Sequence, residues 1–397
     1  MPAVPITSLI PPGVAPDYRG GGLLNLIASC ASACGGAVSH PTLAALPPAD
    51  LADARNVVLV LIDGLGYNYL AGHGAGSALA ARLAGRMTSV FPSTTASAIT
   101  TTFTGLAPAE HGLTGWFTWF PEADTIAAPL PFVARGAGES LQQRGIQART
   151  LYRGMPMFDT LETASLVVLH RSIIDSNYNR HFCGGATRLA YDDLEGFVTQ
   201  TTAAVKSGNG RKFVYAYFPD FDFVSHRHGV GSAKAAAVFA DIDAAFARLL
   251  KQLSGTDSAL ILTSDHGFAD CPAENALDMN DRPDLIAMLA RPLTGERRVA
   301  FCHVLPGLQS EFAARAAEWL DGKGEVLPGK ALLKTGWFGG GDLHPNLADR
   351  VGDFAFMMRE LHTVKDWLPG EPRHLHIGNH GGMSADEMYT PLVYAKT

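Results

Sequence analysis

The chain has 397 residues, of which 47% are hydrophobic, so it can bury a sizeable core and is not a disordered chain. Its formal net charge of -7 argues against a nucleic-acid polymer as the standing partner, because such domains carry a concentrated excess of Lys and Arg. The five cysteines include no Cys-x-x-Cys pair, which excludes the usual patterns of a disulfide framework and of a thiolate zinc site.

The N-terminal segment, residues 1–50, is rich in Pro, Gly and Ala and has no clear periodicity. This composition predicts an extended lead-in on the surface of the protein, with one short helix over 23–34. The first residues lack the basic and apolar regions of a secretion signal, and no apolar run has the length of a membrane span. Together with the few cysteines, these features predict a cytoplasmic protein without a membrane partner, and they leave the oligomeric state open.

Short apolar runs that end in polar residues are typical of buried parallel strands. They occur over 56–66, 212–218 and 258–267, and the segment 232–253 between the last two has helical spacing. A strand, a helix and a strand joined by a right-handed crossover form a parallel sheet. We therefore expect residues 51–397 to form a single α/β domain. The changed composition over about 268–375, with an Ala-rich helix and Gly-rich loops, predicts an inserted subdomain.

Carboxylates and imidazoles follow these predicted strands. Asp63 follows the first strand, and Asp265 and His266 follow the third, at the sheet edge where open α/β proteins bind ligands. Asp222 and His226 have i, i+4 spacing, which places both side chains on one face of a helical turn. We expect these five side chains to share one site.

His380 is a sixth member of the predicted site. It lies among small residues in GNHGGMS, where the backbone can approach closely and the imidazole stays accessible. Three carboxylates and three histidines make a mixed O and N set of the kind that binds zinc or another divalent transition metal. Six ligands suffice for two ions. The other histidines near these segments, at 228, 344, 374 and 376, lack the register of ligands and are expected to be structural or supporting residues, as is His111.

The stretch FPSTTASAITTTFTG, 91–105, presents hydroxyls where a helix is predicted to begin. Pro92, followed by Ser, Thr and an Ala-rich run, is a helix N-terminus signal, so Thr94 or Thr95 would offer a hydroxyl beside free backbone N–H groups. That environment suits a phosphoryl oxygen. A metal ion there would lower the pKa of the hydroxyl and make it nucleophilic near neutral pH.

Five motifs, in this order along most of the chain, carry a specific resemblance: LVLIDGLG, FPSTTASAITTTFTGLAPAEHGL, DFDFVSHRHG, LTSDHG and GNHGGMSADEMYTPL. The chain resembles the alkaline phosphatase superfamily and, within it, the nucleotide pyrophosphatase/phosphodiesterase branch. The resemblance implies a three-layer α/β sandwich with a large, mostly parallel central sheet and an inserted cap subdomain. It also implies a hydrolase that cleaves phosphodiester or phosphoanhydride bonds in a small phosphate ester or nucleotide.

The resemblance also assigns roles to single residues. In the family pattern F-P-[ST]-x-T the second threonine position is the nucleophile, which is Thr95 here, and it carries the phospho-threonine intermediate. Two divalent ions are implied, zinc first and manganese or another transition metal as the alternative, about 4 Å apart as in other two-metal sites. The implied ligands of one ion are Asp222, His226 and His380, and those of the other are Asp63, Asp265, His266 and Thr95.

Trp116 departs from the family pattern. Family phosphodiesterases carry an Asn at this place, after the His-Gly turn, which contacts a phosphoryl oxygen. From Met87 to Ala134 there is no Lys or Arg to meet the extra charge of a monoester, whereas the aromatic run 116–120 offers a wall for an organic substituent. We therefore predict a substrate-binding role for Trp116 and a preference for bis(p-nitrophenyl) phosphate over p-nitrophenyl phosphate. Arg135, Arg153 or a cation from the inserted subdomain would weaken that preference.

Other functions stay open at this point. A phosphomonoesterase or a phosphonoacetate-type hydrolase would keep the same threonine and ligands, and a degenerate metal-binding protein would keep the fold without turnover. A sulfatase is disfavoured because neither C-x-P-x-R nor S-x-P-x-R occurs. The natural substrate is not determined by these residues.

Overall fold

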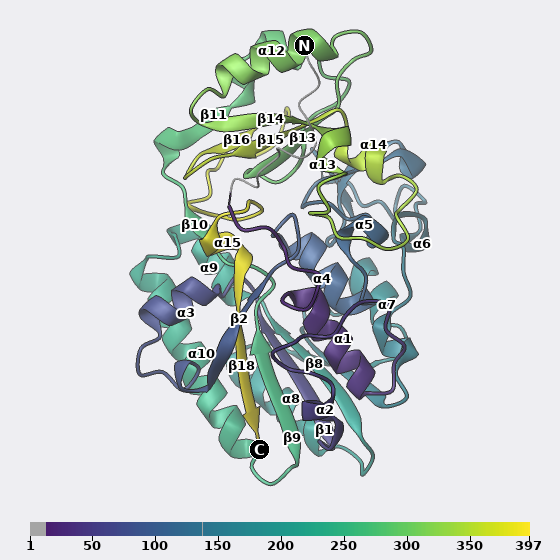
Figure 1. The fold of residues 1–397 in the computed structure, drawn as a ribbon, viewed down its shortest axis with the longest axis vertical. Helices are drawn as coiled ribbons and strands as arrows, with labels where there is room; N and C mark the ends of the chain where they lie inside the picture. Colours follow the sequence, from purple (N-terminus) through teal and green to yellow (C-terminus); the bar gives the residue numbers. More distant parts are fainter. Residues whose placement is uncertain (1–12, 137) are drawn as a thin grey trace.

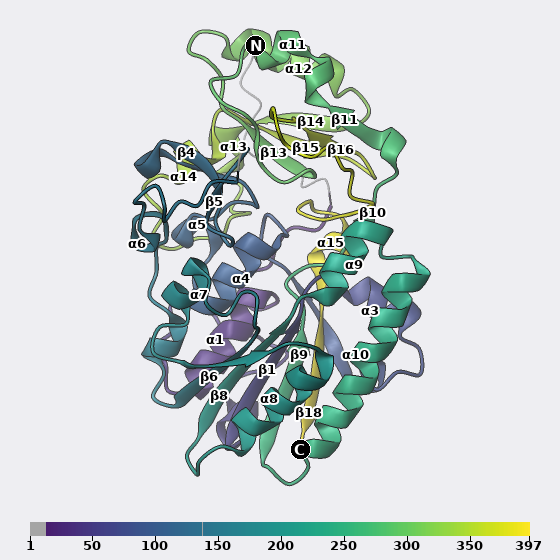
Figure 2. The same ribbon diagram turned by 180° about the vertical axis from the view of Figure 1, so that it is seen from behind.

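The computed structural model describes residues 13–136 and 138–397, and it has a large sheet with a smaller sheet above it (Figures 1 and 2). Part of the predicted lead-in, residues 1–12, lies outside the described residues. In the described part of the chain, every helix is either too short or too polar to span a bilayer.

The large sheet has seven strands, and all of them are parallel except β18, which runs antiparallel to both of its neighbours. The order across the sheet is β2 (Leu83–Thr88), β18 (Tyr389–Lys396), β9 (Ser258–Thr263), β1 (Asn56–Ile62), β8 (Lys212–Phe218), β6 (Ala164–His170) and β7 (Thr187–Tyr191). Every residue of β1, β8 and β9 is buried, as expected for strands covered on both faces.

Helices cover both faces of this sheet, so the architecture has the three layers predicted from the resemblance. The alternation of β1 shows why: Val57 packs into one apolar cluster and Val58 into the other. One face carries α1 (Leu23–Ala33), α4 (Thr95–Thr104) and α7 (Asn177–Phe182), and the opposite face carries α3 (Tyr67–His73), α8 (Leu194–Lys206), α9 (Asp220–His228) and α10 (Ala233–Gln252). Helix α1 is almost entirely buried, so this part of the lead-in belongs to the core instead of wrapping the surface.

Residues 276–365, which we call the cap, form a second sheet with its own core. Its four antiparallel strands are β12 (Thr294–Gly295), β13 (Val299–Cys302), β15 (Phe354–Met358) and β14 (Gly324–Pro328), with α12 (Gln309–Trp319) and α13 (Gly329–Leu332) beside them. Two further strands, β11 (Ala276–Asp278) and β16 (Thr363–Lys365), pair in parallel. A three-stranded sheet of β3 (Thr118–Phe120), β4 (Thr125–Ala128) and β5 (Val133–Ala134) lies outside the cap, and Phe117 bridges to Gly295.

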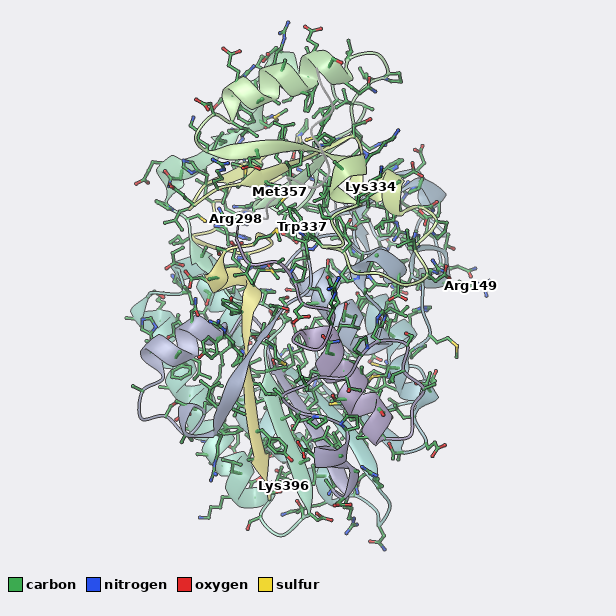
Figure 3. The ribbon with its side chains drawn as sticks, in the orientation of Figure 1. Arg149, Arg298, Lys334, Trp337, Met357 and Lys396 are labelled. Atoms are coloured by element: carbon green, nitrogen blue, oxygen red, sulfur yellow. The ribbon has the colours of Figure 1, made fainter. Side chains whose placement is uncertain are left out.

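A buried ion pair joins the cap to the large domain. The guanidinium of Arg298, labelled in Figure 3, donates two hydrogen bonds of 3.2 Å to the carboxylate of Glu387. Both side chains are almost completely buried. The remaining short elements are α2 (Ala49–Ala52), α5 (Pro108–His111), α6 (Ala148–Leu151), α11 (Pro283–Ile286), α14 (Leu347–Val351), α15 (Ala385–Met388), β10 (Ala269–Asp270) and β17 (Gly378–Asn379).

Candidate active site

The predicted site residues meet at the carboxyl ends of three central strands. Asp63 directly follows β1, and its backbone N–H donates to the carbonyl of Phe218 at the end of β8. Asp265 lies just beyond β9. Asp222 lies in the first turn of α9, the helix that follows β8. Because neighbouring parallel strands end at the same edge of the sheet, residues more than 150 positions apart in the chain share one site.

The threonine pair lies at the start of α4. Thr94 is the N-cap, with extended backbone, and Thr95 is the first helical residue. The Thr95 Oγ1 lies 3.1 Å from Nε2 of His266, whereas the Thr94 hydroxyl donates a hydrogen bond away from this centre, to Glu296. Of the two threonines, Thr95 is therefore the one whose hydroxyl faces the carboxylates and histidines.

The polar atoms form two sets that share one centre. Oδ1 of Asp222, Nε2 of His226 and Nε2 of His380 lie 3.1 to 3.8 Å from one another. In the second set, Nε2 of His266 lies 3.4 Å from Asp63 Oδ1 and 3.5 Å from Asp265 Oδ2. Ligands of a tetrahedral ion at about 2.1 Å are separated by about 3.4 Å, so both sets have the spacing of metal ligands.

Each of the three carboxylates has one oxygen without a hydrogen-bond partner in the described part of the chain. These oxygens are Oδ1 of Asp63, Oδ1 of Asp222 and Oδ2 of Asp265, which are buried and accept no hydrogen bond from residues 13–136 or 138–397. Burial, followed by the charges of the other two carboxylates, raises the pKa of Asp63 well above its usual range, and burial and Asp265 do the same for Asp222. Carboxylates that are crowded in this way repel one another unless a cation lies between them. The donor set thus fits divalent metal ions.

The three histidines are oriented by backbone carbonyls. A carbonyl only accepts hydrogen bonds, so each Nδ1 must carry the proton and each Nε2 presents a lone pair to the centre. Burial lowers the pKa of His226 to about 4 and that of His380 well below its usual range, which favours the neutral form that binds metals. The Nδ1 contacts are His226 with the carbonyl of Gly378 at 2.9 Å, His266 with Gly267 at 3.0 Å and His380 with Ser93 at 3.2 Å.

One residue that supports the site was not predicted from the sequence. The hydroxyl of Tyr217 donates to Oδ2 of Asp63, which leaves Oδ1 of Asp63 for the centre. Tyr217 is on β8, where the residues after Lys212 are all apolar or aromatic and none is marked as functional by the sequence. Its pairing opposite Leu61 on β1 is what brings it to Asp63.

A cavity of about 390 Å³ opens beside these residues. Its wall includes Thr95 and Asp222 from the large domain and Glu296 from the cap. The aromatic residues of the run 116–120 lie in two different places. Trp116 and Phe117 line the cavity, whereas Trp119 and Phe120 are buried in the core. The backbone N–H of Trp116 donates to Oε1 of Glu296 at 2.6 Å.

Three cations reach the same cavity, namely Arg135, Arg297 and Lys365. The segment from Met87 to Ala134 contains no Lys or Arg, but the folded site obtains cations from other parts of the chain. Arg153 is not among the lining residues and pairs with Asp342 at 2.5 Å. The cap residues could not be identified from the sequence, because no motif links them to the threonine.

The remaining histidines have different surroundings. His111 is completely buried, and its Nδ1 accepts a hydrogen bond from the backbone N–H of Leu113. His374 and His376 line the cavity, and the ring of His376 lies 4.4 Å from that of His226.

The chain matches a known protein family and shares its fold with solved structures. The model of the type I phosphodiesterase / nucleotide pyrophosphatase family matches residues 57–382. The search of curated proteins found no match. Among solved structures, an inactive murine ectonucleotide pyrophosphatase / phosphodiesterase 5 in complex with AMP is 20% identical, with a TM-score of 0.63 over 85% of this chain and 87% of that one.

Two other solved structures share the fold. The human ectonucleotide pyrophosphatase / phosphodiesterase 5 is 19% identical, with a TM-score of 0.63 over 85% of this chain and 87% of that one. The phosphonoacetate hydrolase of Sinorhizobium meliloti, in complex with phosphonoacetate, is 18% identical, with a TM-score of 0.62 over 86% and 90%. Because the family model spans most of the chain and the fold agrees, the protein belongs to the type I phosphodiesterase / nucleotide pyrophosphatase family.

Proposed function

We propose that this protein is a two-metal hydrolase that cleaves phosphodiester or phosphoanhydride bonds through a covalent intermediate on Thr95. The observation that carries the proposal is the set of three buried, unpartnered carboxylate oxygens beside three oriented histidines and one hydroxyl. Such a set is costly without cations and well suited to them.

The ligands follow the sets described above. Asp222, His226 and His380 would hold one ion, and Asp63, Asp265, His266 and Thr95 would hold the other. Zinc fits these nitrogen and carboxylate donors, and manganese is the alternative. When bound, the two ions would lower the pKa of the Thr95 hydroxyl and neutralise charge that develops on the phosphoryl and leaving oxygens.

The residues of the chain perform the remaining tasks. Thr95 loses its proton to water, and its Oγ1 forms a bond to phosphorus while the bond to the leaving oxygen breaks and that oxygen takes up a proton. A water molecule then attacks phosphorus, and Thr95 leaves and regains its proton. The positive end of α4 at Thr95 favours the anionic phosphoryl group throughout.

A second candidate is hydrolysis of a phosphonate or a phosphomonoester by the same residues. The cations at the cavity favour it, because they can neutralise more charge than a simple diester carries. Since the cavity takes residues from the large domain and from the cap, we also propose that residues 51–397 act as one catalytic unit.

The test is hydrolysis by the purified protein with zinc or manganese and with a chelator. We expect metal-dependent release of product from bis(p-nitrophenyl) phosphate or from a nucleotide phosphoanhydride, and an acid-quenched protein that carries the substrate's phosphoryl group on the peptide containing Thr95. A metal-loaded protein that hydrolyses none of these esters, phosphonoacetate or p-nitrophenyl phosphate would refute the proposal and favour a metal-binding protein without turnover.

A further inference from the structure

Two cationic residues of the cap lie on segments that a backbone hydrogen bond links. Arg297 lies between β12 and β13, and Lys365 is the last residue of β16. The backbone N–H of Val364 donates to the carbonyl of Arg297 at 2.9 Å. Both side chains line the cavity that contains Thr95, so a segment distant in sequence supplies a cationic wall to the site.

These cations have no carboxylate within ion-pair distance among the described residues. Arg135 in the same cavity is different, because its guanidinium pairs with Asp366 at 2.7 Å and with Glu371 at 3.1 Å. The guanidinium of Arg297 donates one hydrogen bond, to the carbonyl of His374 at 3.1 Å. The ammonium group of Lys365 lies 4.2 Å from the centre of the Trp367 ring and makes no hydrogen bond to the described part of the chain.

Keeping two unpaired cations together is energetically costly. Both side chains are half-buried, and burial followed by the charge of Arg297 lowers the pKa of Lys365 to about 8. The charges of Glu371 and Asp366 raise this pKa, but less than burial and Arg297 lower it, so Lys365 lies next to a second positive charge that is only partly offset. A bound anion would remove this repulsion and supply the missing hydrogen-bond acceptors.

The two cations also face a second cavity. This cavity has a volume of about 310 Å³, and its lining includes Arg297 and Lys365 together with Trp367, Leu277 and Leu375. By contrast, Thr95, Asp222 and His380 line only the first cavity. Arg297 and Lys365 thus separate the space beside the nucleophile from a further, partly apolar space.

We infer that Lys365 and Arg297 bind a second anionic group of the substrate, a carboxylate or a phosphate, which is distinct from the phosphoryl group attacked by Thr95. The inference rests on the proposed function and narrows its substrate class to phosphoesters, phosphoanhydrides or phosphonates with an additional acidic group. Their remaining organic part extends into the second cavity. Simple esters lack the group that these cations bind and are poor ligands.

Binding to the metal-loaded Thr95→Ala protein tests this inference without turnover. Titration calorimetry would compare two matched pairs: ADP with AMP, and phosphonoacetate with its carboxyl methyl ester. In this background Lys365→Met, which keeps the length of the side chain, should weaken binding of the two-acid ligand by about 10- to 100-fold. Binding of AMP and of the methyl ester should change by less than about 2-fold. The pair with the larger loss identifies phosphate or carboxylate as the second group.

Three further variants control for folding and charge. Lys365→Arg should restore the affinity, and Arg297→Gln, which keeps a donor for the His374 carbonyl, should reproduce the selective loss. Lys334→Met removes an equal charge from an exposed position of the cap, labelled in Figure 3, and should have no effect. An equal loss for both members of each pair, or no loss for the two-acid ligands, would overturn the inference. Selective binding by a protein without hydrolase activity would refute only the proposed function.

Discussion

Oε1 of Glu296 accepts a hydrogen bond of 2.5 Å from the hydroxyl of Thr94, which joins the cap to the residue that precedes Thr95, the proposed nucleophile. The same oxygen accepts the backbone N–H of Trp116 at 2.6 Å. Burial raises the pKa of Glu296 to about 7, although both hydrogen bonds lower it. One carboxyl group of the cap therefore fixes both the start of α4 and the segment that carries the aromatic wall.

Replacement of Glu296 tests this connection. Glu296→Ala leaves a hydroxyl and an N–H without an acceptor, which should lower the free energy of unfolding by about 1 to 3 kcal/mol and kcat by roughly 10-fold. Glu296→Gln keeps an acceptor oxygen and should retain most of both. Urea denaturation and steady-state kinetics would measure the two effects. If the Gln and Ala variants behaved alike, the role would lie in the charge and not in the acceptor.

The two threonines should respond differently to substitution. Thr95→Ala removes the proposed nucleophile and should lower kcat by roughly 1,000-fold or more while metal content stays unchanged. Thr95→Ser keeps a hydroxyl and should retain part of the activity. Thr94→Ala removes only the hydrogen bond to Glu296 and should lower kcat by about 5-fold. The reverse ranking of the alanine variants would assign the reaction to Thr94.

Asp265→Asn should release metal, because the amide keeps the shape of the side chain and loses its charge. We expect metal affinity to fall by at least roughly 100-fold, with a parallel loss of activity, as measured by elemental analysis after dialysis. Asp192→Asn, at an exposed carboxylate that pairs with Arg171, is the matched control and should retain full metal content. Full occupancy in the Asp265→Asn protein would remove Asp265 from the ligand set.

Chelation should destabilise the wild-type protein, since it leaves the carboxylates of Asp63, Asp222 and Asp265 to repel one another. In the metal-free state Asp265→Asn should be more stable than wild type by about 1 to 3 kcal/mol, because one of the three charges is gone. Thermal unfolding with and without chelator would measure both changes. A wild-type Tm that is independent of metal would contradict the proposed ligands.

Buried His111 should make the protein sensitive to acid. Burial, followed by the charges of Arg350 and His344, lowers its pKa from 6.5 to about 3. Between these pH values the unfolded chain binds more protons than the folded chain, so the stability from this group is complete above pH 6.5 and is lost as pH falls toward 3. His111→Asn keeps an acceptor for the N–H of Leu113 and removes the titration.

The measurement is the free energy of unfolding at about pH 7.5 and pH 5.5. Between these two pH values the free energy of unfolding of the wild type should fall by about 1.4 kcal/mol more than that of His111→Asn. The reason is that pH 5.5 is about one unit below the pKa of this histidine in the unfolded chain. Equal losses in the two proteins would mean that His111 is protonated in the folded state.

Local sequence patterns were sufficient to predict the central strands of the large sheet and the helix that follows one of them. The continuous apolar runs of β1, β8 and β9 are buried on both faces, and the i, i+4 spacing of Asp222 and His226 lies on α9 as predicted. In each case the deciding contacts are short in sequence or follow from the common edge of a parallel sheet. The roles of the ligands and of Thr95 stay predictions.

The walls of the site could not be predicted in the same way. Glu296 meets Thr94 across 202 positions, and Lys365 reaches the cavity only because β16 pairs with β11 and leads back from the cap. Such contacts depend on how the cap is seated, which no local periodicity encodes. The predicted surface position of the lead-in was wrong over α1 for a related reason. The apolar side chains of α1 pack against helices that are distant in sequence and not against neighbouring residues.

The antiparallel strand β18 lies between β2 and β9 in the large sheet. Among the strands of the described residues, β18 is the one that pairs with β2. Because β2 is synthesised early and β18 last, β2 has no partner strand until the end of translation. His380 emerges only shortly before that strand. Assembly of this sheet edge and completion of the proposed ligand set are therefore late events of biosynthesis, and a nascent chain that stalls before Gly378 would expose β2 without its partner strand to aggregation.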